Sequence, residues 1–556
     1  MLGERGPQRG LFEADTLYLD YVGRGTFYAF LAAERGQLFR DEDFAGLYSA
    51  TRGRPSVAPS LLATALVLQW HDRVSDEEAR RRAAYDLQWK VALGIPLEDR
   101  PFAKSTLQEF RAQLVVHAEQ GAIFRRSLDL AKRRGRLKGT LRLALDTTNI
   151  LGRGAVKDTY NLLADGIVLV LRALGGLAGE AVAETAERLG YGRYVAGASL
   201  KGQAAIDWDD AAQRRRFLAG VVADADRLLE AVRATRGQLV ADSPADRVLA
   251  DAAGLLSRVL QQDIERRADG PALREGVAKD RMPSVHDPQM RHGRKSKAKR
   301  FDGHKLQLAV DTESQVITDV AVLAGNVPDK EEALGVVEAS EALTGCVVEE
   351  TVGDCAYGDG ATRRQFADAK RTLIAKVPSV RNQGRFPKTR FRIDLDAKTC
   401  TCPAGQVTHL RSRAQRGPVF RFAATVCAAC PLRPECVRGR GGRTVQVHPE
   451  EALLQQARAF QNSAAFAPYR ARRQVVEHRI ARLAQLGVRQ ARYRGTAKTL
   501  FQAFMVAAVA NLTLLAAGTG PNWHLFSLIA GLGALLLARR AHSEPIAALG
   551  RGRVIA

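Results

Sequence analysis

The sequence has too few acidic residues to balance its basic ones. Its 556 residues include 60 Asp and Glu against 83 Lys and Arg, a formal net charge of +23. A chain with this excess of positive charge is expected to bind a polyanion. Nucleic acid is the first candidate, because Lys and Arg that neutralise phosphates release condensed counterions. A ribosomal or purely structural DNA-binding protein would show the same excess, so charge alone does not predict an enzyme.

Segments that would direct the chain to a membrane or out of the cell are missing or too short. The N-terminal residues MLGERGPQRG lack the apolar run of a secretory signal. The apolar run at 523–538 has 16 residues, whereas a membrane-spanning helix needs about 20. We therefore expect a cytoplasmic, nucleoid-associated protein with no membrane partner. Residues 516–556 should form a C-terminal tail, with a buried helix or a poorly ordered segment over the apolar run.

The cysteines do not suit a framework of disulfides. There are seven, an odd number, and five of them lie close together, which favours metal ligation in a reducing compartment. Zinc takes four tetrahedral ligands. The preferred set for one structural zinc ion is Cys402, Cys427, Cys430 and Cys436, with Cys400 as the substitute for Cys402. The alternative is a group of reduced free thiols.

Residues 1–135 show a pattern of short, arginine-rich helices. The pairs Ser75 with Glu78 and Ser105 with Gln108 each have the spacing of a capping box and predict the start of a helix. Such helices are typical of a helix-turn-helix-like DNA-binding domain. A plain helical bundle with a solvated basic surface would show the same pattern.

Residues 136–515 alternate between strand and helix patterns, which predicts an α/β fold. Residues 160–275 have helical spacing, and 291–300 form a basic linker with six Lys or Arg and no acid. The predicted strands are 141–145, 304–311, 316–323, 347–352 and 372–377.

Two aspartates follow predicted strands. Asp146 closes the strand 141–145, and Asp354 comes soon after the strand 347–352. Side chains at strand ends point into the crevice at the edge of an open α/β sheet, where such sheets place their sites. Taken singly, each aspartate is as well explained by a turn or a helix cap.

A third carboxylate is isolated among cations. Glu477 is the only acidic residue between Glu451 and Glu544, and nine Lys or Arg lie within 470–498. It sits beside an apolar helical stripe, where it could be partly buried. The ordinary explanation is an ion pair with Arg473, four residues earlier. The functional one is a ligand of Mg²⁺ or Mn²⁺, since two such ions between carboxylates can activate an attacking oxygen and stabilise a leaving one.

The residues around Glu477 resemble the Tyr-Arg-Glu signature of insertion-sequence transposases of the DDE (Asp-Asp-Glu) type. That signature spaces Tyr, two residues, Arg, three residues, Glu, six residues and Lys. Arg472 fits the spacing from Tyr469, and Arg473 fits the spacing to Glu477, so one residue is extra. Ala484 stands where the signature has Lys.

Other segments resemble this family in the same order along the chain. They are GRPS at 53–56, YDLQW at 85–89, SK at 296–297, FDGHK at 301–305, GNVPD at 325–329, GDCAY at 353–357, and 487–495 followed by Lys498. The resemblance implies an RNase H-like catalytic core with a mixed sheet, preceded by an all-α DNA-binding domain. A helical insertion at 160–275 and a Cys-rich insertion at 380–445 would interrupt the core.

The same resemblance implies a transposase that binds the terminal inverted repeats of a mobile element, cleaves there and joins the ends to target DNA. Asp146, Asp354 and Glu477 would hold two metal ions, and two copies of the chain would form the active complex on double-stranded DNA. The residues expected to bind DNA are Tyr469, Arg472, Arg473, Arg294, Lys295 and Lys297. The alternatives are a metal-dependent nuclease that does not join strands, and a non-catalytic DNA-binding relative.

Overall fold

The computed structural model describes residues 1–556 except 6–13, 198, 297, 412–417 and 519–556. Lys297 and the apolar run 523–538 therefore lie outside the described residues. The chain divides into two compact units, one of residues 1–113 with 508–556 and one of residues 114–507. Helix α8 (Ala122–Arg133), which the sequence placed in the N-terminal domain, falls in the second unit.

The described elements of residues 1–113 are all helical. Ser75 caps α5 as predicted, since its hydroxyl accepts the Glu78 N–H at 3.2 Å. Ser105 lies inside the first turn of α7 and does not precede it. The helices are α1 (Ala14–Leu17), α2 (Leu19–Val22), α3 (Phe27–Leu38), the 3-10 helix η1 (Asp41–Leu47), α4 (Pro59–Asp72), α5 (Asp76–Tyr85), α6 (Leu87–Leu93) and the start of α7 (Lys104–Val116).

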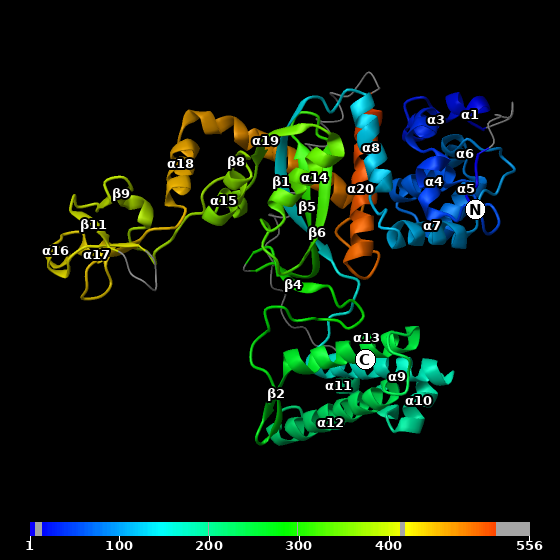
Figure 1. The fold of residues 1–556 in the computed structure, drawn as a ribbon, viewed down its shortest axis with the longest axis horizontal. Helices are drawn as coiled ribbons and strands as arrows, with labels where there is room; N and C mark the ends of the chain where they lie inside the picture. The colour runs from blue at the N-terminus through cyan, green and yellow to red at the C-terminus, as the bar shows by residue number, and fades with distance from the viewer. Residues whose placement is uncertain (6–13, 198, 297, 412–417, 519–556) are drawn as a thin grey trace, which may run out of the picture. The chain divides into compact units, whose positions relative to one another are not determined.

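The second unit contains a six-stranded mixed sheet in the order β4-β5-β1-β7-β8, with β6 paired to β5 (Figure 1). Strands β5 and β6 form the predicted antiparallel hairpin, and β7 and β8 run parallel to β1. Helices α14 (Ala333–Thr344) and α19 (Ala467–Gln485) each contact three of these strands. The strands are β1 (Thr140–Leu151), β4 (Arg291–Arg294), β5 (Arg300–Asp311), β6 (Ile317–Ala324), β7 (Val347–Val352) and β8 (Leu373–Ile374).

Two predictions about this sheet were wrong. Residues 291–300 are not a linker, because Arg291–Arg294 pair with β5 as strand β4. Strand β1 does not end before Asp146, because the antiparallel ladder with β5 continues to Leu151. That ladder requires glycine at 303, where φ is +151° and a Cβ would lie 2.1 Å from the Ile150 carbonyl oxygen.

The helical insertion has its own hydrophobic core, formed by the apolar faces of its longer helices. Its last residues, predicted as helix, form the hairpin β2–β3 around Gly270, whose φ of +115° suits a turn. The elements are α9 (Thr159–Ala178), α10 (Val182–Leu189), α11 (Leu200–Gln203), α12 (Ala211–Arg236), α13 (Pro244–Asp263), β2 (Ile264–Arg267) and β3 (Gly270–Leu273).

The Cys-rich insertion folds as an antiparallel five-stranded sheet in the order β13-β12-β11-β10-β9. The segment is short and rich in polar residues. The sheet nevertheless buries one apolar face, which includes Phe391, Cys400, Phe420 and Val445. The elements are β9 (Arg392–Asp394), β10 (Thr399–Thr401), β11 (Val407–Arg411), β12 (Val419–Arg421), α16 (Ala424–Ala428), α17 (Arg433–Cys436) and β13 (Thr444–Gln446).

Two helices among the described residues are long and apolar enough to cross a membrane by length and composition. They are α9 and α20 (Thr496–Ala517). Half of the apolar window of α9 and 67% of that of α20 is buried inside the protein. Core helices of soluble proteins pass the same test, so these helices are weak evidence for a membrane span.

Candidate active site

The pairing register of β1 and β7 places Asp146 and Asp354 at equivalent positions, each two residues after a paired residue. Ala144 in β1 pairs with Val352 in the parallel strand β7. Asp146 and Asp354 each lie two residues further along, so both stand at the edge where the β7 pairing ends. Glu477 comes from helix α19, which contacts both strands. All three residues line one open pocket of about 440 Å³.

The pocket disfavours the charged form of Asp146. The pKa of the Asp146 carboxyl is raised to about 6, mainly by burial and also by the nearby Asp354 and Glu477. The Thr147 N–H, which donates to Asp146 Oδ1 at 2.7 Å, and the charge of Arg473 act in the opposite direction. A divalent cation between these carboxylates would offset both the burial and the repulsion.

Glu477 is more exposed than expected. Its side chain is 46% exposed and forms an ion pair with Arg473 at 2.6 Å, which is the ordinary explanation allowed by the sequence. Over the described part of the chain, no group of three or more His, Cys, Asp or Glu is arranged to hold a metal ion. The three carboxylates therefore share a pocket without forming a coordination sphere as they stand.

Lys305 and Asp329 also line this pocket, and neither was singled out from the sequence as a site residue. Lys305 Nζ donates to Asp329 Oδ1 and to the Val327 carbonyl, both at 2.7 Å, and both side chains line the pocket. Asp329 is thus a fourth carboxylate at the site. Asp329 ends the GNVPD segment that resembles the transposase family, and this segment could have pointed to it. Its position in a loop after β6 gave no other reason to single it out.

A buried tyrosine adjoins the carboxylates. Tyr357 is 1% exposed, and its hydroxyl has no hydrogen-bond partner among the described residues. Burial raises the pKa of Tyr357 well above its usual value, with further contributions from Asp146, Asp329 and Asp354. A buried hydroxyl without a partner is costly, but Tyr357 is not among the residues that line the pocket.

The residues predicted to bind DNA differ in whether they line the pocket. Arg294 and Lys295 line the pocket, together with Arg489, which the sequence did not single out. Tyr469 and Arg472 do not line it. The Tyr469 hydroxyl donates to Glu350 in β7 at 3.0 Å, and the Arg472 guanidinium binds the same carboxylate. These two residues therefore tie α19 to the strand that precedes Asp354.

Four of the five clustered cysteines surround a second, much smaller cavity. Cys402, Cys427, Cys430 and Cys436 line about 30 Å³ of largely apolar space. Burial raises the pKa of Cys436, and Cys427, Cys402 and Cys430 add to the effect, so these four thiols are close neighbours. Cys400 does not line this cavity and is fully buried in the core of the sheet. As they stand, the thiols are not arranged to hold a metal.

Two segments of the chain match families of known proteins. Residues 401–516 match the family described as "Transposase DDE domain", and residues 21–113 match the family described as "Transposase domain (DUF772)". No curated protein and no solved structure matches the chain. Both families are transposase families, and the two matches support an insertion-sequence transposase of the DDE type. The first match contains Glu477 and the pocket cysteines, whereas Asp146 and Asp354 lie outside it.

Proposed function

We propose that this transposase cleaves DNA at the ends of its element and joins those ends to target DNA, using Asp146, Asp354 and Glu477 as the metal-binding carboxylates. The observation that carries the proposal is the level pairing of β1 and β7, which brings the two aspartates to the pocket that Glu477 also lines. The mixed sheet, with antiparallel β6, β5 and β1 followed by parallel β7 and β8, supports an RNase H-like core.

The residues of the pocket fit divalent metal. Carboxylate oxygens are the ligands that Mg²⁺ and Mn²⁺ prefer. Burial, with smaller contributions from Asp354 and Glu477, raises the pKa of Asp146, and a bound cation would act in the opposite direction. Two bound ions would supply an activated water and stabilisation of the leaving oxygen. The ion pair with Arg473 engages Glu477 Oε1. Glu477 would join Asp146 and Asp354 through its second carboxylate oxygen or by releasing Arg473.

The chain's own cations would hold the DNA at this pocket. Arg294, Lys295 and Arg489 line it and would contact the phosphates that flank the cleaved bond. Arg473, once released from Glu477, would do the same. Lys305 is held in place by Asp329 and Val327, so its ammonium group is oriented before any substrate arrives. Tyr469 and Arg472 would act by holding α19 against β7.

The proposal also covers the other regions of the chain. The helical region 21–113 would recognise the element ends, and two copies of the chain would bring two ends together in the cytoplasm at the nucleoid, without a membrane partner. Cys402, Cys427, Cys430 and Cys436 would bind one structural zinc ion. Their convergence on one small cavity supports this set, and the burial of Cys400 in the core argues against its use as the substitute.

The test uses the full-length protein, Mg²⁺, a duplex with one element end and a supercoiled target plasmid. We expect a nick that leaves a 3′-hydroxyl at the end, followed by covalent joining to the plasmid. Asp354→Asn should abolish both products. Glu349→Gln is the matched control, because Glu349 lies on β7, the strand that precedes Asp354, and outside the pocket. Cleavage without joining would favour a nuclease, and wild-type cleavage by Asp354→Asn would refute the catalytic assignment.

A further inference from the structure

The two insertions of the catalytic unit differ in net charge. Residues 159–273 contain 14 Lys and Arg against 16 Asp and Glu, so the helical insertion is slightly acidic. Residues 380–447 contain 14 Lys and Arg against only three acids, a net charge of +11 in 68 residues. The Cys-rich insertion thus holds much of the excess positive charge of the chain in a small volume, and the helical insertion holds none of it.

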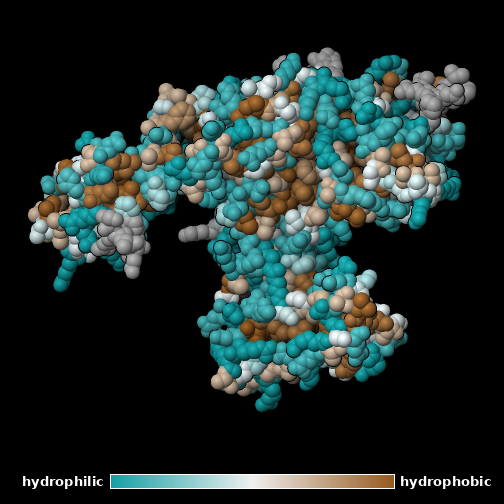
Figure 2. Space-filling view, viewed as in Figure 1, coloured by the Kyte–Doolittle hydropathy of each residue, from teal (hydrophilic) through white to brown (hydrophobic). Residues whose placement is uncertain are grey.

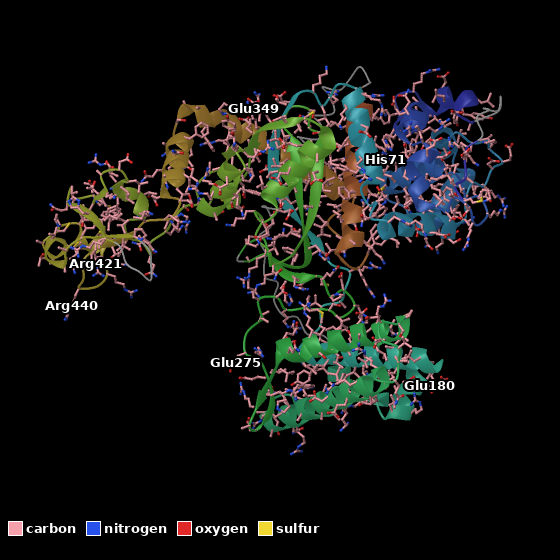
Figure 3. The ribbon with its side chains drawn as sticks, in the orientation of Figure 1. His71, Glu180, Glu275, Glu349, Arg421 and Arg440 are labelled. Carbon is pink, nitrogen blue, oxygen red and sulfur yellow. The ribbon has the colours of Figure 1, made fainter. Side chains whose placement is uncertain are left out.

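The cations of the helical insertion are mostly neutralised within the protein. Eight of its 14 Lys and Arg form ion pairs, for example Arg236 with Asp246 at 2.6 Å and Arg266 with Asp226 at 2.7 Å. Glu180, which is labelled in Figure 3, pairs with Arg188 at 2.7 Å. This charge balance is what a solvated protein surface requires.

The cations of the Cys-rich insertion are not neutralised in this way. Of the 12 that the structure describes, only Lys388 forms an ion pair, with Glu451. Eight others are exposed and have no ion pair with any described residue: Arg381, Arg390, Arg392, Lys398, Arg411, Arg421, Arg438 and Arg440. Arg421 and Arg440 are labelled in Figure 3, and Figure 2 shows hydrophilic side chains along the upper and lower edges of this part of the chain.

The register of the sheet gathers three of these arginines on its outer face. The inner face carries Cys400, Leu410 and Phe420 of the small core. Because side chains alternate along a strand, Arg392 in β9, Arg411 in β11 and Arg421 in β12 all project from the opposite face. The only acid on that face is Asp394, whose carboxylate caps a turn by accepting the Ala397 N–H.

Unpaired like charges on one small sheet repel each other, and the repulsion destabilises the fold unless an anion lies against them. We propose that the outer face of this sheet, with Arg392, Arg411 and Arg421, is a second DNA-binding surface that contacts the phosphate backbone of a duplex. The proposal rests on the proposed function in one respect, that the chain acts on DNA. Arginine suits phosphate because its planar fork can donate two hydrogen bonds at once.

The proposed surface is separate from the carboxylate pocket. Arg392, Arg411 and Arg421 are not among the residues that line that pocket. The surface therefore does not depend on Asp146, Asp354 or Glu477, and the two proposals can fail separately.

The experiment compares two triple variants of the full-length protein. Arg392→Ala/Arg411→Ala/Arg421→Ala removes the three arginines of the proposed surface. Arg216→Ala/Arg233→Ala/Arg247→Ala removes three equally exposed arginines without ion pairs from the helical insertion. The readout is affinity for a duplex of fixed length over a range of salt concentrations. Each phosphate contact contributes about 0.9 to the slope of log affinity against log salt.

We expect the first variant to lose about two to three units of slope and to bind at least about tenfold more weakly at low salt. The control variant should bind like the wild type. Replacing the same three arginines of the surface with lysine should restore most of the slope. Unchanged melting temperature would show that the loss is not unfolding.

Two outcomes would overturn the proposal. One is an unchanged salt slope in the surface variant. The other is a preference for RNA of equal length that the surface variant loses. Asp354→Asn separates this test from the proposed catalysis, because it should keep the wild-type slope. If Asp354→Asn still cleaved DNA while the surface variant lost its slope, the catalytic assignment would fail and the DNA-binding surface would stand.

Discussion

The carboxylate pocket and the cysteine cavity both bring together side chains of types that can bind metal. They differ in size and in how far apart their residues lie in the sequence. Asp146, Asp354 and Glu477 are far apart in sequence and surround an open pocket of about 440 Å³. The four cysteines lie within 35 residues of each other around a cavity of about 30 Å³. An open site leaves room for substrate and water, whereas a closed site with four thiols leaves none. The first arrangement suits chemistry, and the second suits structure.

The sharpest way to separate the two sites is to remove one carboxylate. Asp354→Asn keeps the shape of the side chain and should lower DNA cleavage by at least about a hundredfold, equivalent to about 3 kcal/mol of lost metal stabilisation. DNA affinity and melting temperature should change little, because phosphate contacts come from Lys and Arg. Single-turnover cleavage and a binding titration in parallel measure both quantities. A parallel loss of stability would contradict the comparison.

Removing the proposed structural zinc should lower the stability of the Cys-rich insertion. Cys427→Ser should abolish zinc binding and unfold the Cys-rich insertion, since structural zinc contributes on the order of 10 kcal/mol to small domains. Hydrogen exchange should show lost protection over 391–446 and unchanged protection over the helical insertion. Cys346→Ser is the control, because Cys346 lies outside the cavity. Zinc-free protein with full protection of 391–446 would rule out the structural zinc.

A smaller effect distinguishes two adjacent arginines. Arg472 binds Glu350, and Arg473 pairs with Glu477 beside the pocket. Arg473→Ala should therefore reduce the salt slope of DNA binding by about one unit. Arg472→Ala should leave the slope unchanged and lower stability by about 1–3 kcal/mol, because Glu350 loses a partner while half-buried. Equal effects of both variants on the slope would show that Arg472 also contacts DNA.

The same contrast explains how much the sequence could predict. The preferred four cysteines were chosen by their local spacing, and all four line one cavity. Their binding of zinc stays a prediction. Asp146 was singled out for a reason that proved wrong, since it lies within β1 and not at its end. What brings it level with Asp354 is the pairing of Ala144 with Val352, and a register between strands some 200 residues apart is not written in either segment alone.

Other features depended on contacts that no local pattern encodes. The ion pair between Arg473 and Glu477 follows from i,i+4 spacing and was foreseen as an alternative. The bonds from Tyr469 and Arg472 to Glu350 could not be foreseen, because they require the packing of α19 on β7. The core of the Cys-rich insertion was missed for a similar reason, since its five strands are three to five residues long and become visible only when paired.

The last prediction asks what a buried carboxylate costs where no metal pocket compensates for it. Asp319 in β6 is 6% exposed, and burial raises its pKa from the usual 3.8 to about 7. A raised pKa in the folded state means that stability is fully present below pH 3.8 and falls as pH rises towards 7, where the loss levels off. The total loss is at most about 4 kcal/mol. Asp319→Asn keeps the shape and removes the charge, so it should raise the melting temperature at pH 8 by several degrees and by clearly less at pH 5. Thermal unfolding of both proteins at the two pH values, without divalent metal, measures the difference.

The same experiment on Asp146→Asn should also show stabilisation, but added Mg²⁺ should reverse the order for Asp146 alone, because only the wild-type carboxylate gains a ligand. A response of the Asp319 pair to Mg²⁺ equal to that of the Asp146 pair would mean that the pocket has no special affinity for metal.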